Sequence, residues 1–397
     1  MNKLPNGWEE KRLDDLFKEF TEKNHADKNI LASTQDRGVI PSDLLDRHII
    51  RKKESLSNYK LVKKGCFVIS LRSFQGGFEY SNYEGIISPA YTILEPKMKL
   101  VDDFYKYYFK SYYFINKSLP KYAEGIRDGK QIKYKACKEI LVPYPPLDEQ
   151  KRIASALSKI DAYLENTIKL IEEKERFKRG IAKKLLTCKE GENIPEARFK
   201  GFEDEWMEVA ISKIGTIITG NTPSTKNESF WNGNNVWVTP TDIKQKYISN
   251  SERKLTDDGL KKSRKLPANT LLITCIASIG KNAILKCEGA CNQQINAIIP
   301  NKNYNVDFLY YLFENEKSYL KFKAPQSVIK IMSKSEFIKL VFKFPLLEEQ
   351  EKIGEYLSLL DKEIDNLKKQ KELIKEMKRG AMQKLLSGEV RLVDNYD

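Results

Sequence analysis

The fold is decided by a stretch that opens Pro143-Tyr144-Pro145-Pro146-Leu147-Asp148-Glu149-Gln150 and continues to residue 186. The prolines end the preceding segment, because each fixes φ and removes a backbone donor. Beyond them, apolar residues recur every three or four positions with charges between: Ile153, Leu157, Ile160, Leu164, Ile168 and Ile171. This spacing predicts a long amphipathic helix with one apolar stripe.

The same stretch occurs a second time, 200 residues later. Residues 147–186 and 347–386 share 16 of 40 positions without a gap. The matches include polar residues such as Gln350, Ser358 and Asp361, which a shared apolar stripe would not require. We therefore infer an internal duplication rather than two unrelated helices with a similar pattern.

The duplication predicts a mixed α/β (α+β) protein with a pseudo-twofold internal repeat. Its expected parts are a first globular domain (1–146), a helical spacer (147–186), a linker (187–195), a second globular domain (196–346), a second spacer (347–386) and a tail (387–397). Helices of this length form rods of roughly 50–60 Å. Paired as an antiparallel coiled coil, they would hold the lobes at opposite ends; alternatively, each helix packs on its own lobe. We expect the helix and partner interface at Ile153, Leu157, Ile160, Leu164, Ile353, Leu357, Leu360 and Ile364.

Composition describes a globular protein, with 41% hydrophobic and 31% charged residues. The sequence has no apolar run of about 18 residues and no signal-peptide core at its N-terminus, so we expect a cytoplasmic protein without a membrane span. The six cysteines lack Cys-x-x-Cys spacing, and the two histidines, His25 and His48, lie in polar segments. We therefore predict neither a metal site nor disulfides.

The net charge of +14 is divided equally between the two globular regions. Residues 1–146 and residues 196–346 each carry +7. Two similar basic lobes suggest a bound polyanion, either DNA or RNA. The alternative is that this charge only keeps the protein soluble.

Local patterns predict the main elements of both lobes. Strands are expected at 65–71, 140–142, 236–239, 270–274 and 297–299, helices at 103–119 and 307–317, and a loop at 124–131. Faint matches at an offset of 204, such as Ile69 with Ile273 and Gly76 with Gly280, suggest a shared scaffold with different loops. Such lobes would perform one task on two targets, although drift of unused loops would look similar.

Recognised catalytic signatures are missing, including phosphate-binding and dinucleotide loops. Polar loops at strand ends are better candidates, since Arg pairs with guanine, Gln and Asn pair with adenine, and Lys suits phosphates. The predicted DNA-binding residues are Arg72, Ser73, Gln75, Gly76, Arg127, Lys130, Thr222, Ser224, Lys226, Lys281, Asn282, Gln293, Gln294 and Lys330. For each of them, the alternative is a solvated loop side chain.

Two repeated elements resemble the two shared regions of type I restriction–modification specificity subunits. They are Pro-Pro-Leu-Asp-Glu-Gln at 145–150, with its counterpart Pro-Leu-Leu-Glu-Glu-Gln at 345–350, and Lys-Arg-Gly, which occurs in both helices. Further resemblance lies in Arg198-Phe199-Lys200-Gly201-Phe202, Thr222-Pro223-Ser224 with Trp231 and Trp237-Val238, and Ile279-Gly280-Lys281 with Asn292-Gln293-Gln294. The first lobe departs from this pattern, because Gly76-Gly77 and Ser88-Pro89 stand where the second lobe has Gly280-Lys281 and Asn292-Gln293.

The resemblance implies a non-catalytic subunit whose lobes, as target recognition domains, each read one half of a bipartite asymmetric DNA site. The spacer would fix the unread gap and dock two modification (methyltransferase) subunits that bind S-adenosylmethionine. Restriction subunits using ATP and Mg would complete the complex, and this chain itself would bind no cofactor. The alternatives are a stand-alone two-lobed DNA-binding scaffold or regulator, and a nuclease with an unrecognised site.

Overall fold

The computed structural model describes residues 4–45, 53–70, 73–123, 132–324 and 331–393. The chain forms two compact units. The first unit contains Met1–Ile168 and Lys369–Asp397, and the second contains Lys169–Lys368. The long helices are α5 (Leu147–Leu186) and α11 (Leu347–Leu386). Each long helix therefore begins in one unit and ends in the other.

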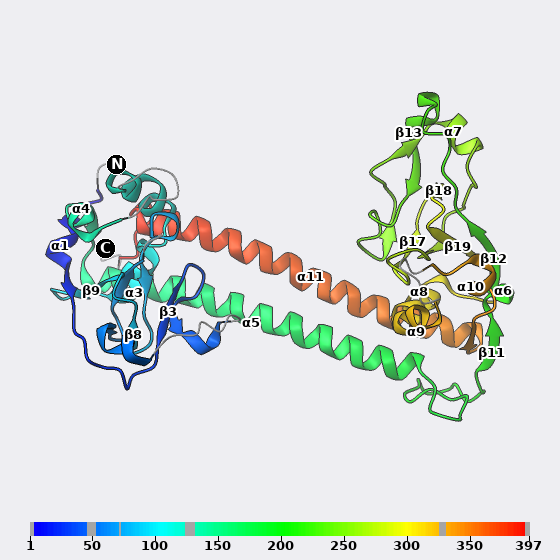
Figure 1. Ribbon diagram of the computed structural model, residues 1–397, viewed down its shortest axis with the longest axis horizontal. Helices are drawn as coiled ribbons and strands as arrows, with labels where there is room; N and C mark the ends of the chain where they lie inside the picture. Colours follow the sequence, from blue (N-terminus) through cyan, green and yellow to red (C-terminus); the bar gives the residue numbers. More distant parts are fainter. Residues whose placement is uncertain (1–3, 46–52, 71–72, 124–131, 325–330, 394–397) are drawn as a thin grey trace. The chain divides into compact units, whose positions relative to one another are not determined.

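The first lobe is built on a four-stranded antiparallel sheet of order β2-β9-β6-β7 (Figure 1). Its strands are β2 (Phe17–Phe20), β9 (Thr92–Pro96), β6 (Phe67–Ile69) and β7 (Glu79–Tyr80). Two-stranded sheets pair β1 (Glu9–Arg12) with β10 (Leu141–Tyr144), β3 (Leu31–Thr34) with β4 (Gly38–Pro41), and β5 (Lys60–Val62) with β8 (Gly85–Ile87). The helical elements are α1 (Leu13–Leu16), η1 (Ser42–Leu44), η2 (Lys53–Asn58), α2 (Ser73–Gly76), α3 (Asp102–Tyr108), η3 (Phe114–Ser118), η4 (Leu119–Tyr122) and α4 (Tyr134–Cys137).

The second lobe is built on a five-stranded sheet of order β12-β19-β16-β17-β14. Its strands are β12 (Gly215–Thr219), β19 (Ile295–Pro300), β16 (Thr270–Thr274), β17 (Asn282–Leu285) and β14 (Tyr247–Ile248). A three-stranded sheet contains β15 (Lys254–Leu255), β13 (Trp231–Val238) and β18 (Gly289–Cys291), and β11 (Met207–Ala210) pairs with β20 (Val341–Phe344). The helical elements are α6 (Ile211–Ile214), η6 (Glu228–Phe230), α7 (Asp257–Lys261), α8 (Val306–Asn315), α9 (Lys317–Lys323) and α10 (Lys334–Phe337).

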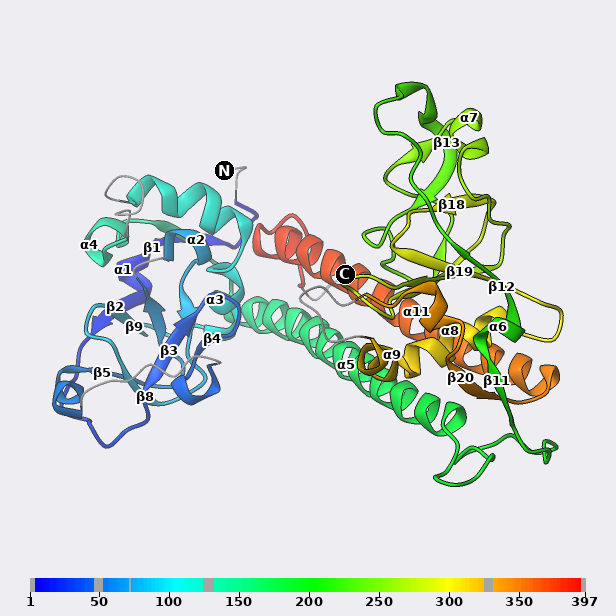
Figure 2. The same ribbon diagram turned by 45° about the vertical axis from the view of Figure 1, so that its right-hand side comes forward.

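The two lobes repeat one topology, which confirms that the duplication extends beyond the helices. The order β2-β9-β6-β7 corresponds strand by strand to β12-β19-β16-β17. The outer pairs also match, with Glu9 opposite Tyr144 in one lobe and Met207 opposite Phe344 in the other. The second lobe adds β14 and the three-stranded sheet, which extends away from β12 and β19 (Figure 2).

Each lobe shares its core with the ends of both long helices. The first core contains Ile153 and Leu157 from the start of α5, together with Leu385 and Leu386 from the end of α11. In the second core, Ile353, Leu357 and Leu360 from α11 meet Leu185 and Leu186 from α5. Burial of these apolar side chains, at about 1.5–3 kcal/mol each, fastens both helices to each lobe.

Within each unit the two helices run antiparallel and are joined by ion pairs. In the second unit, Lys174 Nζ lies 2.8 Å from Glu363, and Lys178 pairs with Asp361. In the first, Lys378 Nζ lies 2.6 Å from Asp161. The predicted antiparallel pairing is therefore present. Each helix also packs on a lobe. Both arrangements are possible together because the helix ends contact the lobe cores, whereas other residues of the helices contact each other.

The structure places most of the predicted interface positions of the helices against the lobe cores. Six of the eight residues pack against a lobe core: Ile153, Leu157, Ile160, Ile353, Leu357 and Leu360. Of the others, Ile364 is buried and Leu164 is half-buried. These side chains stabilise the chain itself, so a partner subunit would have to contact other residues of the helices.

Most predicted elements are present, but the helix predicted at 103–119 is wrong as one element. It is split into α3 and the π-helical turn η3, because the buried Ser111 begins the second turn: its Oγ accepts the backbone N–H of Phe114 at 3.2 Å. The strand predicted at 270–274 is confirmed as β16, and the helix predicted at 307–317 is confirmed as α8, one residue earlier at its start. The loop predicted at 124–131 lies outside the described residues.

Candidate nucleic-acid interface

Two tryptophans of β13 anchor the polar loop that follows β12. Trp237 Nε1 donates to the backbone oxygen of Asn221 at 3.1 Å, and Trp231 Nε1 donates to that of Ser224, also at 3.1 Å. The two indoles meet edge to face, with their centroids 5.0 Å apart. Both rings are buried, so the loop rests on a rigid apolar support while Thr222, Ser224 and Lys226 stay exposed.

Asn221 ties this loop to a basic segment after α7. Its side-chain amide donates to the Lys262 backbone oxygen at 3.0 Å and accepts the Arg264 backbone N–H at 2.8 Å. The Arg264 guanidinium donates to the backbone oxygen of Thr219 at 2.6 Å. These bonds place residues 262–264 beside the anchored loop.

A third segment, residues 291–294, completes the surface. Thr222 Oγ1 donates to Gln293 Oε1 at 2.5 Å, and Asn292 Nδ2 donates to Gln294 Oε1 at 2.9 Å. The Thr222 bond fills one of the two acceptor positions of the Gln293 carbonyl oxygen and orients the amide group. The result is a surface of exposed amide, hydroxyl and cationic groups, the chemistry that reads base edges and phosphates.

Only some of the predicted residues of the second lobe lie on this surface. Thr222, Ser224, Lys226 and Gln293 are exposed on the surface just described, and Gln294 is half-buried there. Lys281 is exposed, and its Nζ donates to the backbone oxygen of Pro240 at 3.1 Å. Lys330 lies outside the described residues.

Asn282 is not available for contact with a ligand in this structure. Its side chain is 4% exposed, and its amide donates to Glu314 at 2.8 Å. Its position within β17 explains the burial, because the strand turns this side chain toward α8. Asn282 is therefore better explained as a link between the sheet and the helix.

The first lobe offers a smaller described surface. Gln75 is exposed and Gly76 is half-buried, whereas Ser73 is buried with its Oγ accepting the backbone N–H of Ser70 at 2.8 Å. Lys110 joins the end of α2 to the segment around Gln35. Its Nζ donates to the backbone oxygens of Gly76 at 2.7 Å and Gln35 at 3.1 Å. The other predicted residues, Arg72, Arg127 and Lys130, lie outside the described residues.

Sequence reasoning missed Arg253, Lys262 and Arg264. Arg264 and Lys262 flank the anchored loop through the Asn221 bonds, and the Arg253 guanidinium lies 3.8 Å from the centroid of the Trp231 ring. The basic character of the segment around α7 could have indicated that these residues bind DNA. However, nothing local in the sequence shows which strand this segment pairs with. It is the pairing of β15 with β13 that brings Arg253 to the tryptophans.

The repeated Glu-Gln pair at the start of each long helix has a structural role. Glu149 accepts two hydrogen bonds from Arg391, at 2.7 and 2.8 Å, and one from Trp8 at 2.8 Å. Burial by itself would raise the Glu149 pKa, but these hydrogen bonds outweigh it and hold the pKa below the ordinary carboxyl value. Gln150 Oε1 accepts the Val101 backbone N–H at 2.9 Å, which ties α5 to the segment before α3.

The second unit repeats this arrangement with residues from a different part of the chain. Glu349 accepts hydrogen bonds from Arg198 at 2.8 and 2.7 Å and from Trp206 at 3.3 Å. Arg198 precedes the first strand of its lobe, β11, whereas Arg391 comes from the C-terminal segment. The segment predicted as a tail therefore contributes to the first lobe the arginine that, in the second lobe, comes from the start of the predicted globular domain.

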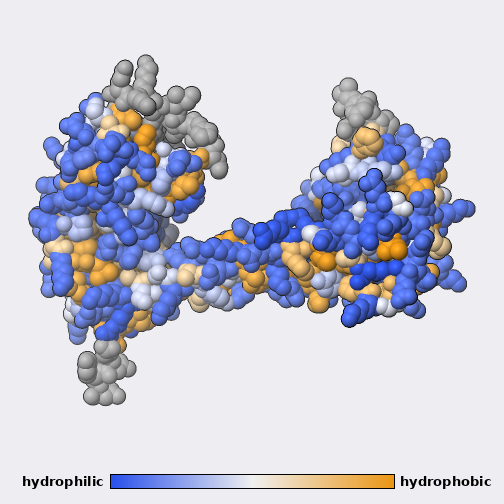
Figure 3. Space-filling view, turned by 90° about the horizontal axis from the view of Figure 1, so that it is seen from below, coloured by the Kyte–Doolittle hydropathy of each residue, from blue (hydrophilic) through white to orange (hydrophobic). Residues whose placement is uncertain are grey.

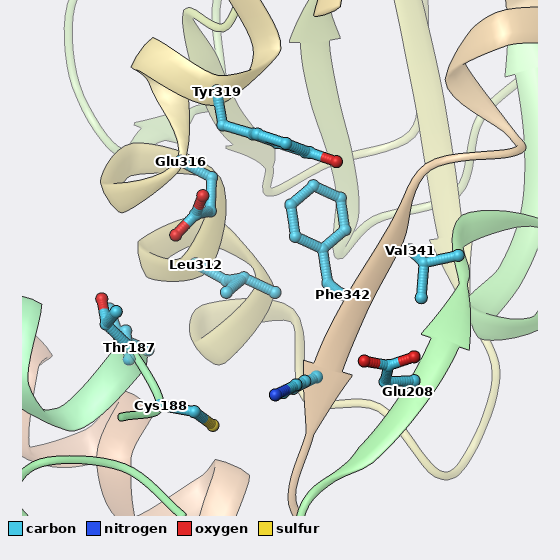
Figure 4. A pocket seen from close by; sticks show the side chains of 10 residues that line it. Thr187, Cys188, Glu208, Leu312, Glu316, Tyr319, Val341 and Phe342 are labelled. Atoms are coloured by element: carbon cyan, nitrogen blue, oxygen red, sulfur yellow. The ribbon is translucent and has the colours of Figure 1, made fainter. Parts of the chain in front are cut away.

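A small hollow in the second unit is lined by none of the residues that form the surface at 221–226, 262–264 and 291–294. It has a volume of about 260 Å³ and is lined by residues of α8, α9, β11, β20 and the segment after α5, including Cys188, Glu208 and Glu316 (Figure 4). Burial raises the pKa of the Glu316 carboxyl, which accepts a hydrogen bond from the Asn315 side chain at 2.9 Å. Within the described ranges no group of His, Cys, Asp and Glu side chains could hold a metal ion, and no helix could span a membrane.

The outer faces of the long helices carry exposed apolar side chains. Phe177 and Leu359 of the second unit are 52% and 53% exposed, and Leu373 and Met377 of the first unit are 65% and 50% exposed. Figure 3 shows hydrophobic residues among hydrophilic ones along the helices. Single exposed apolar residues are common on protein surfaces, but a contiguous group of them marks a contact surface.

Comparison with known proteins identifies relatives over almost the whole chain. The model of the type I restriction modification DNA specificity domain matches residues 5–173 and 203–376. The MjaVIII specificity subunit of Methanocaldococcus jannaschii is 26% identical over 98% of this chain and 94% of its own length. The MjaIX specificity subunit of the same organism is 36% identical, but over only 44% of this chain and 42% of its own.

Solved structures share the fold at low sequence identity. The HsdS subunit from Thermoanaerobacter tengcongensis superposes with a TM-score of 0.58, at 16% identity over 98% of each chain. The S subunit of a type I restriction–modification system from M. genitalium gives a TM-score of 0.55, at 16% identity over 97% of each chain.

Proposed function

Because the chain belongs to the type I restriction modification DNA specificity family, we propose that it selects the DNA sequence on which such a complex acts. Each lobe reads one half of a split, asymmetric site. The observation that carries the proposal is the duplicated lobe, since one scaffold occurs twice with different loops. The surface formed by residues 221–226, 262–264 and 291–294 provides neutral and cationic donors suited to duplex DNA.

The long helices are the spacer that sets the unread gap between the half-sites. Each helix enters both lobe cores, so neither lobe can change its attachment without disturbing buried leucines such as Leu157 or Leu357. A continuous helix of 40 residues is about 60 Å long. This length suits half-sites that lie one to two turns of B-DNA apart, since one turn is about 34–36 Å.

Two modification subunits dock on the outer faces of the helices. The exposed side chains of Phe177, Leu359, Leu373 and Met377 support this assignment, because an apolar partner surface would remove them from water. The chain itself performs no chemistry in this scheme. S-adenosylmethionine belongs to the modification subunits, and ATP and Mg belong to restriction subunits.

The test is a genome-wide map of adenine methylation in the source cell, with and without this gene. Loss of one split motif, two short half-sites around a fixed gap, is the expected result. An unchanged map in cells that contain the assembled complex would contradict the proposal and favour a stand-alone DNA-binding scaffold. Isolation of the tagged chain from the same cells shows whether a methyltransferase accompanies it.

A further inference from the structure

We propose that Arg253 reads a guanine, donating two hydrogen bonds to N7 and O6 on the major-groove edge of the base. This inference rests on the proposed function and deepens it, because it assigns one base contact to one residue of the second lobe. It starts from a stacked arginine that lies outside every motif recognised in the sequence.

The Arg253 side chain is held by the paired indoles. Its guanidinium carbon lies 3.8 Å from the centroid of Trp231 and 5.3 Å from that of Trp237. Stacking on an aromatic face fixes the plane of the guanidinium, and the attraction between the cation and the ring adds to the packing. The fork of N–H donors therefore keeps a defined direction before any ligand binds.

The Arg253 backbone is fixed as well. The buried Ser251 accepts the Trp237 backbone N–H at 3.0 Å, and its hydroxyl donates to the Arg253 backbone oxygen at 2.7 Å. One serine thus joins β13 to the residue that stacks on it. Contacts with β13 thus fix both the backbone of Arg253 and the plane of its guanidinium group. The side chain therefore has little conformational entropy left to lose on binding.

The guanidinium nevertheless has no acceptor among the described residues. Arg253 is exposed and makes neither a side-chain hydrogen bond nor an ion pair with any described residue. A pre-oriented arginine whose donors no described residue occupies is suited to an external acceptor. By contrast, the Arg264 guanidinium is already bonded to the backbone oxygen of Thr219.

The surroundings favour a base edge over a phosphate. The same two indoles hold the loop of Thr222, whose hydroxyl bonds Gln293, so Arg253 lies near neutral groups that suit base edges. Exposed lysines, Lys226 and Lys262, provide the mobile point charges that suit phosphates. Guanine presents two acceptors that match the arginine fork.

The experiment selects duplexes from a random DNA pool with the tagged full-length chain, isolated together with its bound partner subunits. The variants are Arg253→Met, which keeps the aliphatic packing on Trp231 without donors, and Lys213→Ala. Lys213 is an exposed cation of α6, away from β13 and α7 in the same lobe (Figures 1 and 2). We expect R253M to lose the preference for guanine at one base pair of one half-site, and K213A to select the wild-type motif.

Replacing that guanine by 7-deazaguanine tests the contact itself, because the analogue lacks N7. Loss of the bidentate pair should make R253M bind the selected duplex about 5- to 150-fold more weakly than the wild-type complex does. The analogue should weaken the wild type and leave R253M without a further loss. Equal weakening of R253M on selected and random duplexes would overturn the assignment and indicate a phosphate contact.

Two outcomes separate this inference from the proposed function. If the wild-type complex selects no split motif, the proposed function fails and the Arg253 assignment fails with it. If the wild type selects a split motif and R253M selects the same one, only the assignment fails.

Discussion

At the scale of single residues, the bond between Arg391 and Glu149 carries a stability that can be measured. Arg391→Ala would leave the Glu149 carboxylate, with a side chain 2% exposed, without its cationic partner. Breaking a buried pair in this way costs about 3–5 kcal/mol, and the loss should lie toward the lower end because Arg391 is itself partly exposed. Chemical denaturation of the full chain measures the loss. Arg12→Ala is the control, because the Arg12–Glu139 pair is solvent-exposed, and we expect it to cost less than about 1 kcal/mol.

The pH dependence of this effect follows from the lowered Glu149 pKa. A carboxyl whose pKa is lower in the folded state contributes stability at pH values above its unfolded pKa, and this contribution is lost as pH falls through the folded pKa. The gap in stability between wild type and R391A should therefore narrow as pH drops below 4.5, the ordinary carboxyl value. A gap that stays constant through this range would contradict the ionic interpretation.

A second residue, Gln293, tests readout by the anchored loop. The Thr222 hydroxyl fills one of the two acceptor positions of Gln293 Oε1, so that the second acceptor position and the amide N–H groups can bind a base. Gln293→Ala should relax the specificity of one half-site only, at a cost of about 1–3 kcal/mol if the contact is bidentate. Methylation mapping of cells carrying the variant shows the effect. A uniform loss on all DNA would instead indicate phosphate positioning or misfolding.

At the scale of elements, the long helices were the part best predicted from sequence. The spacing of their apolar residues is a local property of the sequence. Residues such as Ile153 and Leu157 therefore predict a buried stripe without knowledge of the rest of the fold. What the stripe packs against is not local, because the bond between Glu149 and Arg391 joins residues 242 positions apart. For the same reason, the sequence predicted Gln293 as a candidate and missed Arg253, whose place depends on the pairing of β15 with β13.

The spacer role of the helices predicts the effect of an insertion. Adding seven residues to both α5 and α11, at the boundaries after Ile168 and Lys368, keeps the apolar stripe nearly in phase. The gap in the methylated motif should lengthen while both half-site sequences stay the same. Altered half-sites with an unchanged gap, observed by methylation mapping, would disprove the spacer model.

The exposed apolar residues of the helices predict where partner subunits bind. Phe177→Lys and Leu373→Lys place a charge at two positions of the proposed docking face, one in each unit, and should reduce the methyltransferase recovered with the tagged chain. The control is Glu173→Lys, at another exposed position of α5, which introduces a lysine without removing an apolar contact. Equal recovery with all three variants would argue against this face.

At the scale of the whole molecule, the C-terminal segment makes the first unit depend on both ends of the chain. Arg391 binds Glu149 and the backbone oxygen of Asn6, and the Leu392 backbone oxygen accepts a hydrogen bond from Arg152 at 3.3 Å. In the second unit, Arg198 makes the equivalent bond to Glu349, and both residues belong to the continuous segment Lys169–Lys368. Each unit thus needs one such arginine, but only the first receives it from the end of the sequence.

Deleting residues 388–397 should therefore weaken the first unit selectively. The deletion removes Arg391 and its bonds to Glu149 and leaves the Arg198–Glu349 pair of the second unit intact. Hydrogen exchange should show faster opening of the first lobe with unchanged protection of the second. In cells, specificity should decline at one half-site before the other. Equal destabilisation of both units would show that they unfold as one cooperative body, and that each arginine stabilises the whole protein.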